Sequence, residues 1–374
     1  MKILHVISPL TKGGAERVAV ELANAFARSG DEVTILASNP ADPRLLQADI
    51  DPAVDLRFVS QSRRSRLFSY LAALGWLWAN REFLASRDIV HGHLTFGSLF
   101  GTLVVTMRRR WAWQSPRVME TYHAVGMAMS GVKRRLHLRL AASHDGLVTM
   151  ASDPEIDAFR RAHPRLPYAL IPNGISFDRA GASPSDVAAY RRSLGIPLGA
   201  PVVGTIGRII ADRSPHRMVE IFASIARARP DVHFFMGGAG PETERTRTIT
   251  AELGLGKRMS MPGLVLDPAL PLAILDLYVT LNVGPITGVA AMEAAASGVP
   301  VVALQLDRSY TPTGDDWIFS SADPEAVARE AARLLGSPEQ LRGLAARQRG
   351  YVRRHHSVDG MAAAYRDFYR SLIA

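Results

Sequence analysis

A glycine-rich loop and the short helix after it carry the residues best suited to chemistry. Residues 284–303 read Gly-Pro-Ile-Thr-Gly-Val-Ala-Ala-Met-Glu-Ala-Ala-Ala-Ser-Gly-Val-Pro-Val-Val-Ala. Backbone N–H groups of such a loop, here those of Thr287 and Gly288, and the positive end of the helix both favour a phosphate. Glu293 lies about two turns into the helix, where its carboxylate can reach hydroxyl groups of the same ligand. The segment indicates a nucleotide-sugar site, although an ordinary α/β loop and helix would show a similar pattern.

A pair of arginines follows the predicted strand 201–206. The segment after that strand begins with Gly207 and Arg208, and Arg213 comes five residues after Arg208. Ligands of α/β sheets bind at the carboxyl ends of parallel strands. Two guanidiniums at this spacing can both reach a diphosphate through charge-assisted hydrogen bonds. A solvated surface pair is the alternative interpretation of these two residues.

The first half of the chain offers a second set of residues at strand ends. Gly14 lies at the start of the predicted helix 15–29, and glycine there lets a ligand approach the backbone closely. His93 and His123 follow predicted strands, a position that favours ligand contact, although a lone histidine is more often structural. His91 and His93 are not indicated as a metal site, because no carboxylate with ligand spacing accompanies them.

The elements that must position these residues alternate between strand and helix along the chain. Short apolar runs predict strands, and apolar residues at helical spacing predict helices. Strands separated by helices indicate parallel sheets and two Rossmann-like domains. The predicted strands are 2–7, 32–36, 56–59, 89–91, 118–122, 146–150, 169–171, 201–206, 233–236, 259–261, 277–280 and 300–304. The predicted helices are 15–29, 217–229, 242–253, 268–275, 288–296, 325–335 and 357–372, with a hinge in 180–200 that contains a turn at 183–185.

The composition is that of a globular protein. The chain has 374 residues, of which 47% are hydrophobic and 21% charged, enough for two domains with separate cores. It contains no cysteine, which excludes disulfides and cysteine metal sites and fits the cytoplasm. The longest apolar runs, 67–79 and 96–107, are shorter than the about 20 residues that span a bilayer. Because the first strand begins at Lys2, we expect no signal peptide.

The positive charge is concentrated in one segment. Residues 62–140 contain thirteen Arg and Lys but only three acids, a net charge of +10, whereas the whole chain carries +9. Apolar residues that include Trp78 and Trp111 lie between these basic ones. A basic face beside Trp and Leu is typical of binding to an anionic membrane surface. A solvated basic face is the alternative, and nucleic acid is not expected, since no helix-turn-helix, zinc or RNA-binding signature is present.

Taken in chain order, these segments resemble the motifs of retaining glycosyltransferases of family 4 (GT4), which have the GT-B fold. Residues 284–303 resemble their nucleotide-binding motif. In 207–213 the Gly-Arg pair matches, and Arg213 replaces a lysine. The remaining matches are Gly-Gly-Ala-Glu at 13–16, His-x-His at 91–93, Thr-x-His at 121–123 with Ala124 in place of a glycine, Pro-Asn-Gly at 172–174, Gly-x-Gly-Pro within 236–242 and Gly-x-Val-x-Asp at 263–267.

The resemblance implies a role for each matching residue. Arg208 and Arg213 would act as catalytic residues that hold the donor diphosphate and stabilise its charge as it leaves. His123, the third implied catalytic residue, would contact the transferred sugar, and Glu293 would bind the ribose. The other implied donor contacts are Gly14, Gly207, Gly240, Val265, Thr287 and Gly288, and the implied acceptor-side residues are Glu16 and His93.

One position departs from the family pattern. The family has two glutamates eight positions apart, and Pro285 stands where the first would precede Glu293. The first glutamate usually binds the donor sugar and helps to stabilise the charge at the reacting carbon. Proline also supplies no backbone N–H group. The substitution leaves open a second interpretation, a non-catalytic or partner-dependent GT-B subunit.

The resemblance implies two Rossmann-like domains that face each other across a cleft. An acceptor-binding domain would comprise 1–180 and a C-terminal helix, 357–374, that crosses back onto it, and a donor-binding domain would comprise 181–356. The implied reaction is retaining transfer of a sugar from a nucleotide diphosphate to an acceptor hydroxyl, giving an α-linkage.

Several expectations about partners follow from this resemblance. We expect no metal and no cofactor, and a UDP-sugar is favoured over a GDP-sugar. The preferred acceptor is a lipid-linked glycan at the inner face of a bacterial membrane, in polysaccharide or lipopolysaccharide synthesis. A nucleotide-sugar epimerase of the same shape is a further alternative, but it would need acid and base groups around the sugar that the sequence does not offer.

Overall fold

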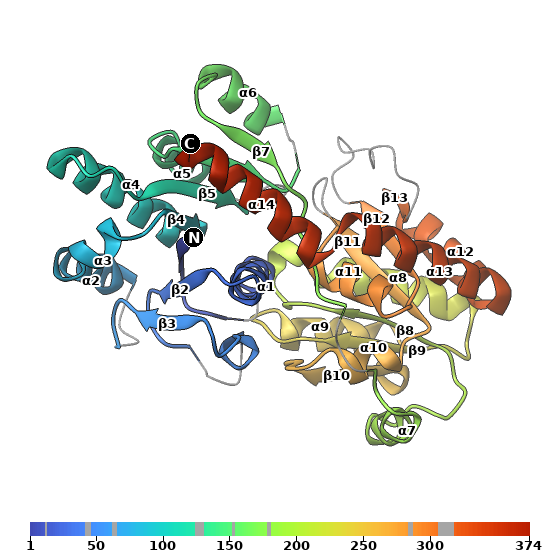
Figure 1. Ribbon diagram of the computed structural model, residues 1–374. Coiled ribbons are helices and arrows are strands. Elements are labelled where there is room, and N and C mark those ends of the chain that lie inside the picture. The colour runs from blue at the N-terminus through green and yellow to red at the C-terminus, as the bar shows by residue number, and fades with distance from the viewer. Residues whose placement is uncertain are drawn as a thin grey trace. The chain divides into compact units, whose positions relative to one another are not determined.

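The chain folds into two compact units. The computed structural model describes residues 1–11, 13–41, 46–61, 66–123, 131–151, 154–177, 181–282, 287–305 and 318–374 (Figure 1). The N-terminal unit comprises Met1–Ile175 and Ser357–Ala374, and the C-terminal unit comprises Ser176–His356. The predicted boundary between residues 180 and 181 lies shortly after this division in the sequence.

The N-terminal unit is built on a seven-stranded sheet in the order β3-β2-β1-β4-β5-β6-β7. Every neighbouring pair is parallel, and both β1 and β2 are buried after their first residue. Such apolar strands require helices on both faces, as the predicted α/β class implies. The strands are β1 Lys2–Ile7, β2 Glu32–Ala37, β3 Asp55–Phe58, β4 Ile89–His93, β5 Arg117–Tyr122, β6 Gly146–Thr149 and β7 Tyr168–Leu170.

Helices of this unit bury apolar faces against the sheet. In α1 the predicted apolar stripe of Val18, Leu22 and Phe26 is buried, and the helix ends before Gly30, whose φ is +84°. The helices that lie between α1 and β7 in the sequence were not predicted individually. The helices are α1 Gly14–Arg28, α2 Arg66–Ala79, α3 Arg81–Ala85, α4 Leu94–Trp111, α5 Gly131–Ala141, α6 Pro154–Ala162 and α14 Val358–Ile373, with a short 3₁₀ helix at Leu46–Asp49.

The last helix, α14, completes the N-terminal unit, so the predicted return of the C-terminal helix is confirmed. It runs beside α1 (Figure 1), where the ring of Tyr369 stacks on Phe26 at a centroid distance of 5.3 Å. Arg366 of α14 forms an ion pair of 2.6 Å with Asp31. Both Tyr365 and Tyr369 are fully buried, so α14 is part of the core of a unit that otherwise ends at residue 175.

The C-terminal unit contains a six-stranded parallel sheet in the order β10-β9-β8-β11-β12-β13. Sequence analysis predicted each strand except β13. The strands are β8 Val202–Ile206, β9 His233–Gly237, β10 Met259–Gly263, β11 Leu277–Asn282, β12 Val301–Gln305 and β13 Phe319–Ser321. The helices are α7 Pro184–Ser193, α8 Pro215–Ala228, α9 Thr243–Glu252, α10 Ala269–Ala273, α11 Val289–Ala296, α12 Pro324–Leu335 and α13 Pro338–His355.

The segment predicted as a hinge contains a helix. Ser183, which was predicted to lie in a turn, is the N-cap of α7, and its hydroxyl accepts a hydrogen bond from the backbone N–H of Asp186. Pro184 occupies the first turn of that helix, where its missing N–H group costs nothing. The Ser-Pro-Ser pattern therefore begins a helix, which corrects the sequence interpretation of 183–185.

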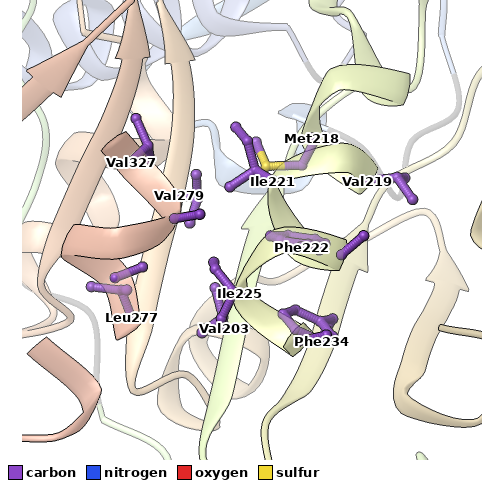
Figure 2. Close-up of a cluster of buried hydrophobic side chains, with 14 of the residues drawn as sticks. Val203, Met218, Val219, Ile221, Phe222, Ile225, Phe234, Leu277, Val279 and Val327 are labelled. Carbon is purple, nitrogen blue, oxygen red and sulfur yellow. The ribbon is translucent and has the colours of Figure 1, made fainter. Parts of the chain in front are cut away.

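Helix α8 packs across the centre of the C-terminal sheet. Figure 2 shows its side chains Ile221, Phe222 and Ile225 among residues from β8, β9 and β11. The rings of Phe222 and Phe234 stack at 4.9 Å. This packing fixes the middle strands of the sheet, whose carboxyl ends lead into the predicted donor-binding residues.

A pair of glycine substitutions tests the packing of the N-terminal unit. A Cβ atom at Gly97 in α4 would lie 2.5 Å from the carbonyl oxygen of Val6 and 2.9 Å from the Cα atom of Gly92. Because both are backbone atoms, Gly97→Ala should lower the free energy of unfolding by about 1–3 kcal/mol. A Cβ atom at Gly75 in α2 meets nothing within 4 Å, so the control Gly75→Ala should raise that free energy by about 0.5–1 kcal/mol. Melting curves measure both effects, and an unchanged Gly97→Ala protein would contradict the first expectation.

Candidate functional site

Each sheet has a point where its strand order reverses, and predicted site residues lie beside it. The reversal falls between β8 and β11 in the C-terminal sheet and between β1 and β4 in the N-terminal sheet. Loops that follow two such strands leave toward opposite faces, so they open a crevice at the carboxyl edge where ligands bind. Gly207, Arg208 and Arg213 follow β8, whereas Thr287 and Gly288 follow β11.

The two arginines after β8 lie close enough to interact electrostatically. Arg213 ends a short 3₁₀ helix, Ala211–Arg213. Partial burial, and then the positive charge of Arg208, lower the pKa of Arg213, whereas Tyr278 and Asp212 raise it. Two guanidiniums held this close repel each other, and a bound diphosphate would relieve that repulsion.

Tyr278 in β11 connects this loop to the site residues after β11, and sequence analysis did not identify it. Its buried hydroxyl accepts a hydrogen bond of 3.0 Å from the N–H of Ile206 and donates one of 2.9 Å to the carbonyl oxygen of Ile206. Burial raises the pKa of Tyr278, the charge of Glu293 raises it further and that of Arg213 lowers it. The carboxylate of Glu293 and the guanidinium of Arg213 therefore both lie near this hydroxyl.

Gly288 begins the helix that carries Glu293. It is the N-cap of α11, and its carbonyl oxygen accepts the N–H of Ala291 at 3.0 Å. Thr287, Gly288 and Glu293 are all partly exposed. Residues 283–286, which include Pro285, lie outside the described residues, so the position that departs from the family pattern has no structural account here.

Close backbone packing brings the loops after β8 and β9 together. A Cβ atom at Gly240 would lie 2.1 Å from the carbonyl oxygen of Ile209, and one at Gly238, whose φ is +146°, would lie 1.8 Å from that of Gly207. Val265 in the next loop reaches the same edge, since its Cγ2 atom would lie 2.6 Å from a Cβ atom at Gly237. Of the predicted donor-binding residues, Gly207, Gly240 and Val265 are thus brought together.

In the N-terminal unit, Gly14 and Glu16 lie in the first turn of α1. Gly14 is the first residue of the helix and is exposed. The carboxylate of Glu16 lies over the preceding backbone, because a Cβ atom at Gly13 would be only 2.1 Å from its Oε2 atom. Its Oε1 atom accepts a hydrogen bond of 2.9 Å from the hydroxyl of Thr11. Glu16 therefore holds the loop after β1, and its predicted contact with an acceptor stays a prediction.

The predicted His93 and His123 belong to a buried cluster of histidines. Nδ1 of His93 lies 3.1 Å from Nε2 of His123, and Nε2 of His93 lies 3.1 Å from Nδ1 of His5. His5 lies in β1. Sequence analysis did not identify it, because nothing in the sequence around it distinguishes it from an ordinary buried residue. Because β1, β4 and β5 are adjacent in the sheet, the three rings form a row across it.

His91 has a different role from His93. Its Nδ1 atom lies 2.7 Å from the hydroxyl of Tyr369, and its Nε2 atom lies 2.7 Å from the hydroxyl of Thr121. The hydroxyl of Thr121 also lies 2.7 Å from that of Tyr365. These contacts attach the last helix to β4 and β5, so His91 anchors α14.

Burial keeps these histidines neutral. It lowers the pKa of His5 to about 3 and that of His123 to about 4, although the charge of Glu120 raises the latter. The pKa values of His91 and His93 are also well below the ordinary value, again chiefly because of burial. At neutral pH each ring therefore has one N–H donor and one bare nitrogen.

His5, His91 and His93 have the spacing of a possible metal site. One ring nitrogen from each lies within 4.8 Å of the others, so the structure adds a third ring to the pair that sequence analysis considered. Both ring nitrogens of His91 already form hydrogen bonds with hydroxyl groups. Ligation by His91 would break one of them, so hydrogen bonding accounts for this ring better than a metal does.

Part of the basic segment 62–140 presents an apolar face. Leu71, Leu74 and Trp78 of α2 are 61%, 52% and 61% exposed, and their spacing places them on one side of the helix. The ring of Trp78 lies 5.6 Å from that of Trp111, and the guanidinium of Arg81 lies over the Trp78 ring. Within the described part of the chain, no helix has both the length and the hydrophobicity to cross a membrane.

Some arginines of that segment are neutralised by distant acids, so its net charge overstates the free basic surface. Arg108 forms two hydrogen bonds of 2.6 and 2.7 Å with Asp145. Arg134 pairs with Glu155 at 2.6 Å. A third arginine, Arg87, is 5% exposed and pairs with Glu32. All three acids lie outside 62–140, which is why the local count missed them.

Two hollows on the surface of the N-terminal unit lie away from the predicted residues. Their volumes are about 500 and 680 Å³, and both are bordered by α6 and the loop after it, including His163 and Leu166. Neither is lined by a predicted site residue. The candidate site therefore consists of strand-end loops rather than of these hollows.

Two family models match the chain. Residues 12–179 match the model described as Glycosyltransferase Family 4. Residues 186–350 match the model described as Glycosyl transferases group 1. Together these two ranges include most of the chain.

Individual relatives and a solved structure are also similar. A 2-deoxystreptamine glucosyltransferase of Streptomyces kanamyceticus is 31% identical over 175 residues, which cover 45% of this chain and less than half, 45%, of that relative. A GDP-mannose-dependent alpha-(1-6)-phosphatidylinositol monomannoside mannosyltransferase of Mycobacterium tuberculosis is 26% identical over 306 residues, 78% of each chain. The structure of Anabaena HepE in complex with UDP and glucose has a TM-score of 0.81 at 18% identity, covering 99% of this chain and 100% of that one, which shows the shared fold.

The Tyr278 hydroxyl offers a test of how the loop after β8 is held. Tyr278→Phe removes both hydrogen bonds to Ile206 and leaves its partly buried N–H and carbonyl groups without that partner. The free energy of unfolding should fall by about 1–3 kcal/mol, as measured by denaturant unfolding. Tyr190→Phe on α7 is the matched control and should change it little. An equal effect of both substitutions would contradict the role assigned to Tyr278.

Proposed function

The chain belongs to the group 1 glycosyltransferases with a family 4 N-terminal half, and from this premise we propose that it is a retaining transferase using a nucleotide-diphosphate sugar. The observation that carries the proposal is the cluster at the carboxyl edge of the C-terminal sheet. There Glu293 and Arg213 both interact electrostatically with the hydroxyl of Tyr278, and Arg208 interacts with Arg213. Two cations and a carboxylate suit a diphosphate and a ribose of one ligand.

In the proposed reaction the acceptor hydroxyl oxygen attacks the anomeric carbon as the bond to the diphosphate breaks. The leaving diphosphate takes the acceptor proton on the same face, which gives an α-linkage. Arg208 and Arg213 stabilise the negative charge that develops on the leaving group. Thr287 and Gly288 supply N–H groups at the N-terminus of α11, and Glu293 binds ribose hydroxyls. We assign His123 to contact with the transferred sugar and Glu16 to the acceptor side. The predicted acceptor-side role of His93 is not part of this proposal, because its ring is fully buried and both of its nitrogens lie within hydrogen-bond distance of His5 and His123.

We favour a UDP-sugar as the donor. The structure of HepE is described as a complex with UDP and glucose, and the Streptomyces relative is named a glucosyltransferase. The mycobacterial relative is named for GDP-mannose, so GDP is the competitor that an experiment must include. The proposed scheme uses no metal ion.

We further propose that the acceptor is a lipid-linked glycan at the inner face of a membrane. Support comes from the exposed Leu71, Leu74 and Trp78 and from exposed arginines such as Arg109 and Arg110 nearby in the fold. Apolar side chains beside cations bind anionic lipid surfaces. The proposed site of action is therefore peripheral to the membrane.

The replacement of the first family glutamate by Pro285 favours a second candidate, a non-catalytic or partner-dependent subunit. Proline can neither bind a sugar hydroxyl through a carboxylate nor donate a backbone N–H. Turnover of a nucleotide sugar by the purified chain would exclude this candidate.

Nucleotide binding tests the donor site directly. A ligand at 100 times its Kd stabilises a protein by about 2.7 kcal/mol, so UDP should raise the melting temperature clearly. GDP, dTDP and CDP should raise it less, and Glu293→Ala should reduce the response to UDP. For transfer, Arg208→Gln should lower kcat about 100-fold or more, whereas Arg217→Gln, an exposed arginine on α8, should not. Absence of a response to all four nucleotides would contradict the enzyme proposal.

Binding to lipid vesicles tests the proposed membrane surface. The protein should sediment with vesicles of phosphatidylcholine and phosphatidylglycerol but not of phosphatidylcholine alone, and added salt should weaken the binding. Trp78→Ser should reduce it because the exposed indole that would insert into the lipid surface is lost. Leu253→Ser is the matched control, since Leu253 is an exposed apolar residue of the C-terminal unit. Equal losses in both variants would overturn the assignment of the surface to α2.

A further inference from the structure

His123 is the last of three imidazoles joined by hydrogen bonds. The first contact, between Nδ1 of His5 and Nε2 of His93, and the second, between Nδ1 of His93 and Nε2 of His123, both measure 3.1 Å. His5 and His93 are fully buried, whereas His123 retains 7% exposure. The row therefore runs from two fully buried rings to the one of the three that retains some exposure.

The protons along this row must all point the same way. Each neutral imidazole has one N–H and one bare nitrogen, and burial keeps the three rings neutral. In one arrangement His5 donates from Nδ1 to His93, which donates from Nδ1 to His123, so His123 carries its own proton on Nδ1. In the reverse arrangement His123 donates from Nε2, His93 donates from Nε2, and His5 carries its proton on Nε2.

The far end of the row distinguishes the two arrangements. Nε2 of His5 is buried and has no hydrogen-bond partner among the described residues. The reverse arrangement would place an N–H group there with no acceptor, whereas the first leaves only a bare lone pair. Buried N–H groups without partners are rarer than acceptors with unused lone pairs. The first arrangement is therefore the more stable one.

We propose that His5 and His93 are positioning residues that hold His123 in the tautomer with the proton on Nδ1. This inference rests on the proposed function, in which His123 meets the transferred sugar. His123 then offers a hydrogen-bond donor and selects an oxygen lone pair, such as that of a sugar hydroxyl. With Nε2 occupied by His93 and Nδ1 protonated, His123 has no free nitrogen to accept the proton of the acceptor hydroxyl. It is thereby excluded as the general base, and the leaving diphosphate keeps that role.

Nitrogen spectroscopy of the whole protein tests the tautomer without any substrate. Long-range ¹H–¹⁵N correlation spectra of histidine-labelled protein distinguish a protonated ring nitrogen from a bare one. The signals of His123 are those lost in His123→Asn. The expected spectrum has a protonated Nδ1 and a bare Nε2, and either the reverse or a mixture of both would overturn the proposal. A spectrum that changes on adding a chelator would also overturn it, because a metal would then be holding the rings.

Variants separate positioning from folding. His93→Phe keeps an aromatic ring but removes the partner of His123, so both tautomers of His123 should appear. His163→Gln, on a histidine outside the row, should leave the His123 signals unchanged. If His93→Phe fails to fold, the wild-type spectrum alone decides the question.

Substitutions at His123 test the inference through the rate of sugar transfer. The amide of His123→Asn can place an N–H near the Nδ1 position, whereas that of His123→Gln reaches the Nε2 position. His123→Asn should therefore retain about tenfold more kcat/KM than His123→Gln, the ratio that one hydrogen bond supports. The reverse order would contradict the proposal. A wild type with the expected tautomer but no turnover would instead refute only the proposed function.

Discussion

The candidate site of the C-terminal unit depends on one steric constraint. At two positions in the loop after β9, a carbonyl oxygen of the loop after β8 occupies the space that a Cβ atom would need, so only glycine fits. Gly238 and Gly240 lie against the carbonyl groups of Gly207 and Ile209. That approach allows the N–H groups of Gly207 and Ile209 to donate to the carbonyl oxygens of Gly237, at the end of β9, and of Ala239 at 2.9 and 3.1 Å. The loops after β8 and β9 thus extend the sheet beyond its strands. Arg208 and Arg213 follow β8 at this edge of the sheet.

The N-terminal unit reaches a similar rigidity through hydroxyl groups. Tyr365, Tyr369 and Thr121 meet around His91 with contacts of 2.7 Å. This network lies next to the row that ends at His123, since the ring centroids of His91 and His93 are 3.9 Å apart. The two histidines of the His-x-His pattern, which look equivalent in the sequence, are separated by these contacts.

Local patterns were sufficient to predict most of the fold. Apolar runs predicted twelve of the strands, and the alanine-rich helix 288–296 and the amphipathic C-terminal helix were found from periodicity and composition. The exception among the strands, β13, is a short edge strand with the polar sequence Phe-Ser-Ser, so it has no apolar run to detect.

What sequence analysis missed depends on partners that are distant in the chain. His5 joins the candidate site only because His93 lies beside it in the sheet. Tyr278 joins it only because β11 pairs with β8, which brings its hydroxyl to Ile206. The basic segment was overestimated for the same reason, since Asp145 and Glu155 neutralise two of its arginines. Composition counts charges, whereas the fold decides which of them remain free.

The position of α14 has a consequence for synthesis of the protein. The first 175 residues leave the ribosome long before α14 does, and the whole C-terminal unit is made in between. Until the last residues emerge, the surfaces of Phe26 and His91 that Tyr369 will cover remain open to solvent or to chaperones. The first unit to be translated is therefore the last to be finished.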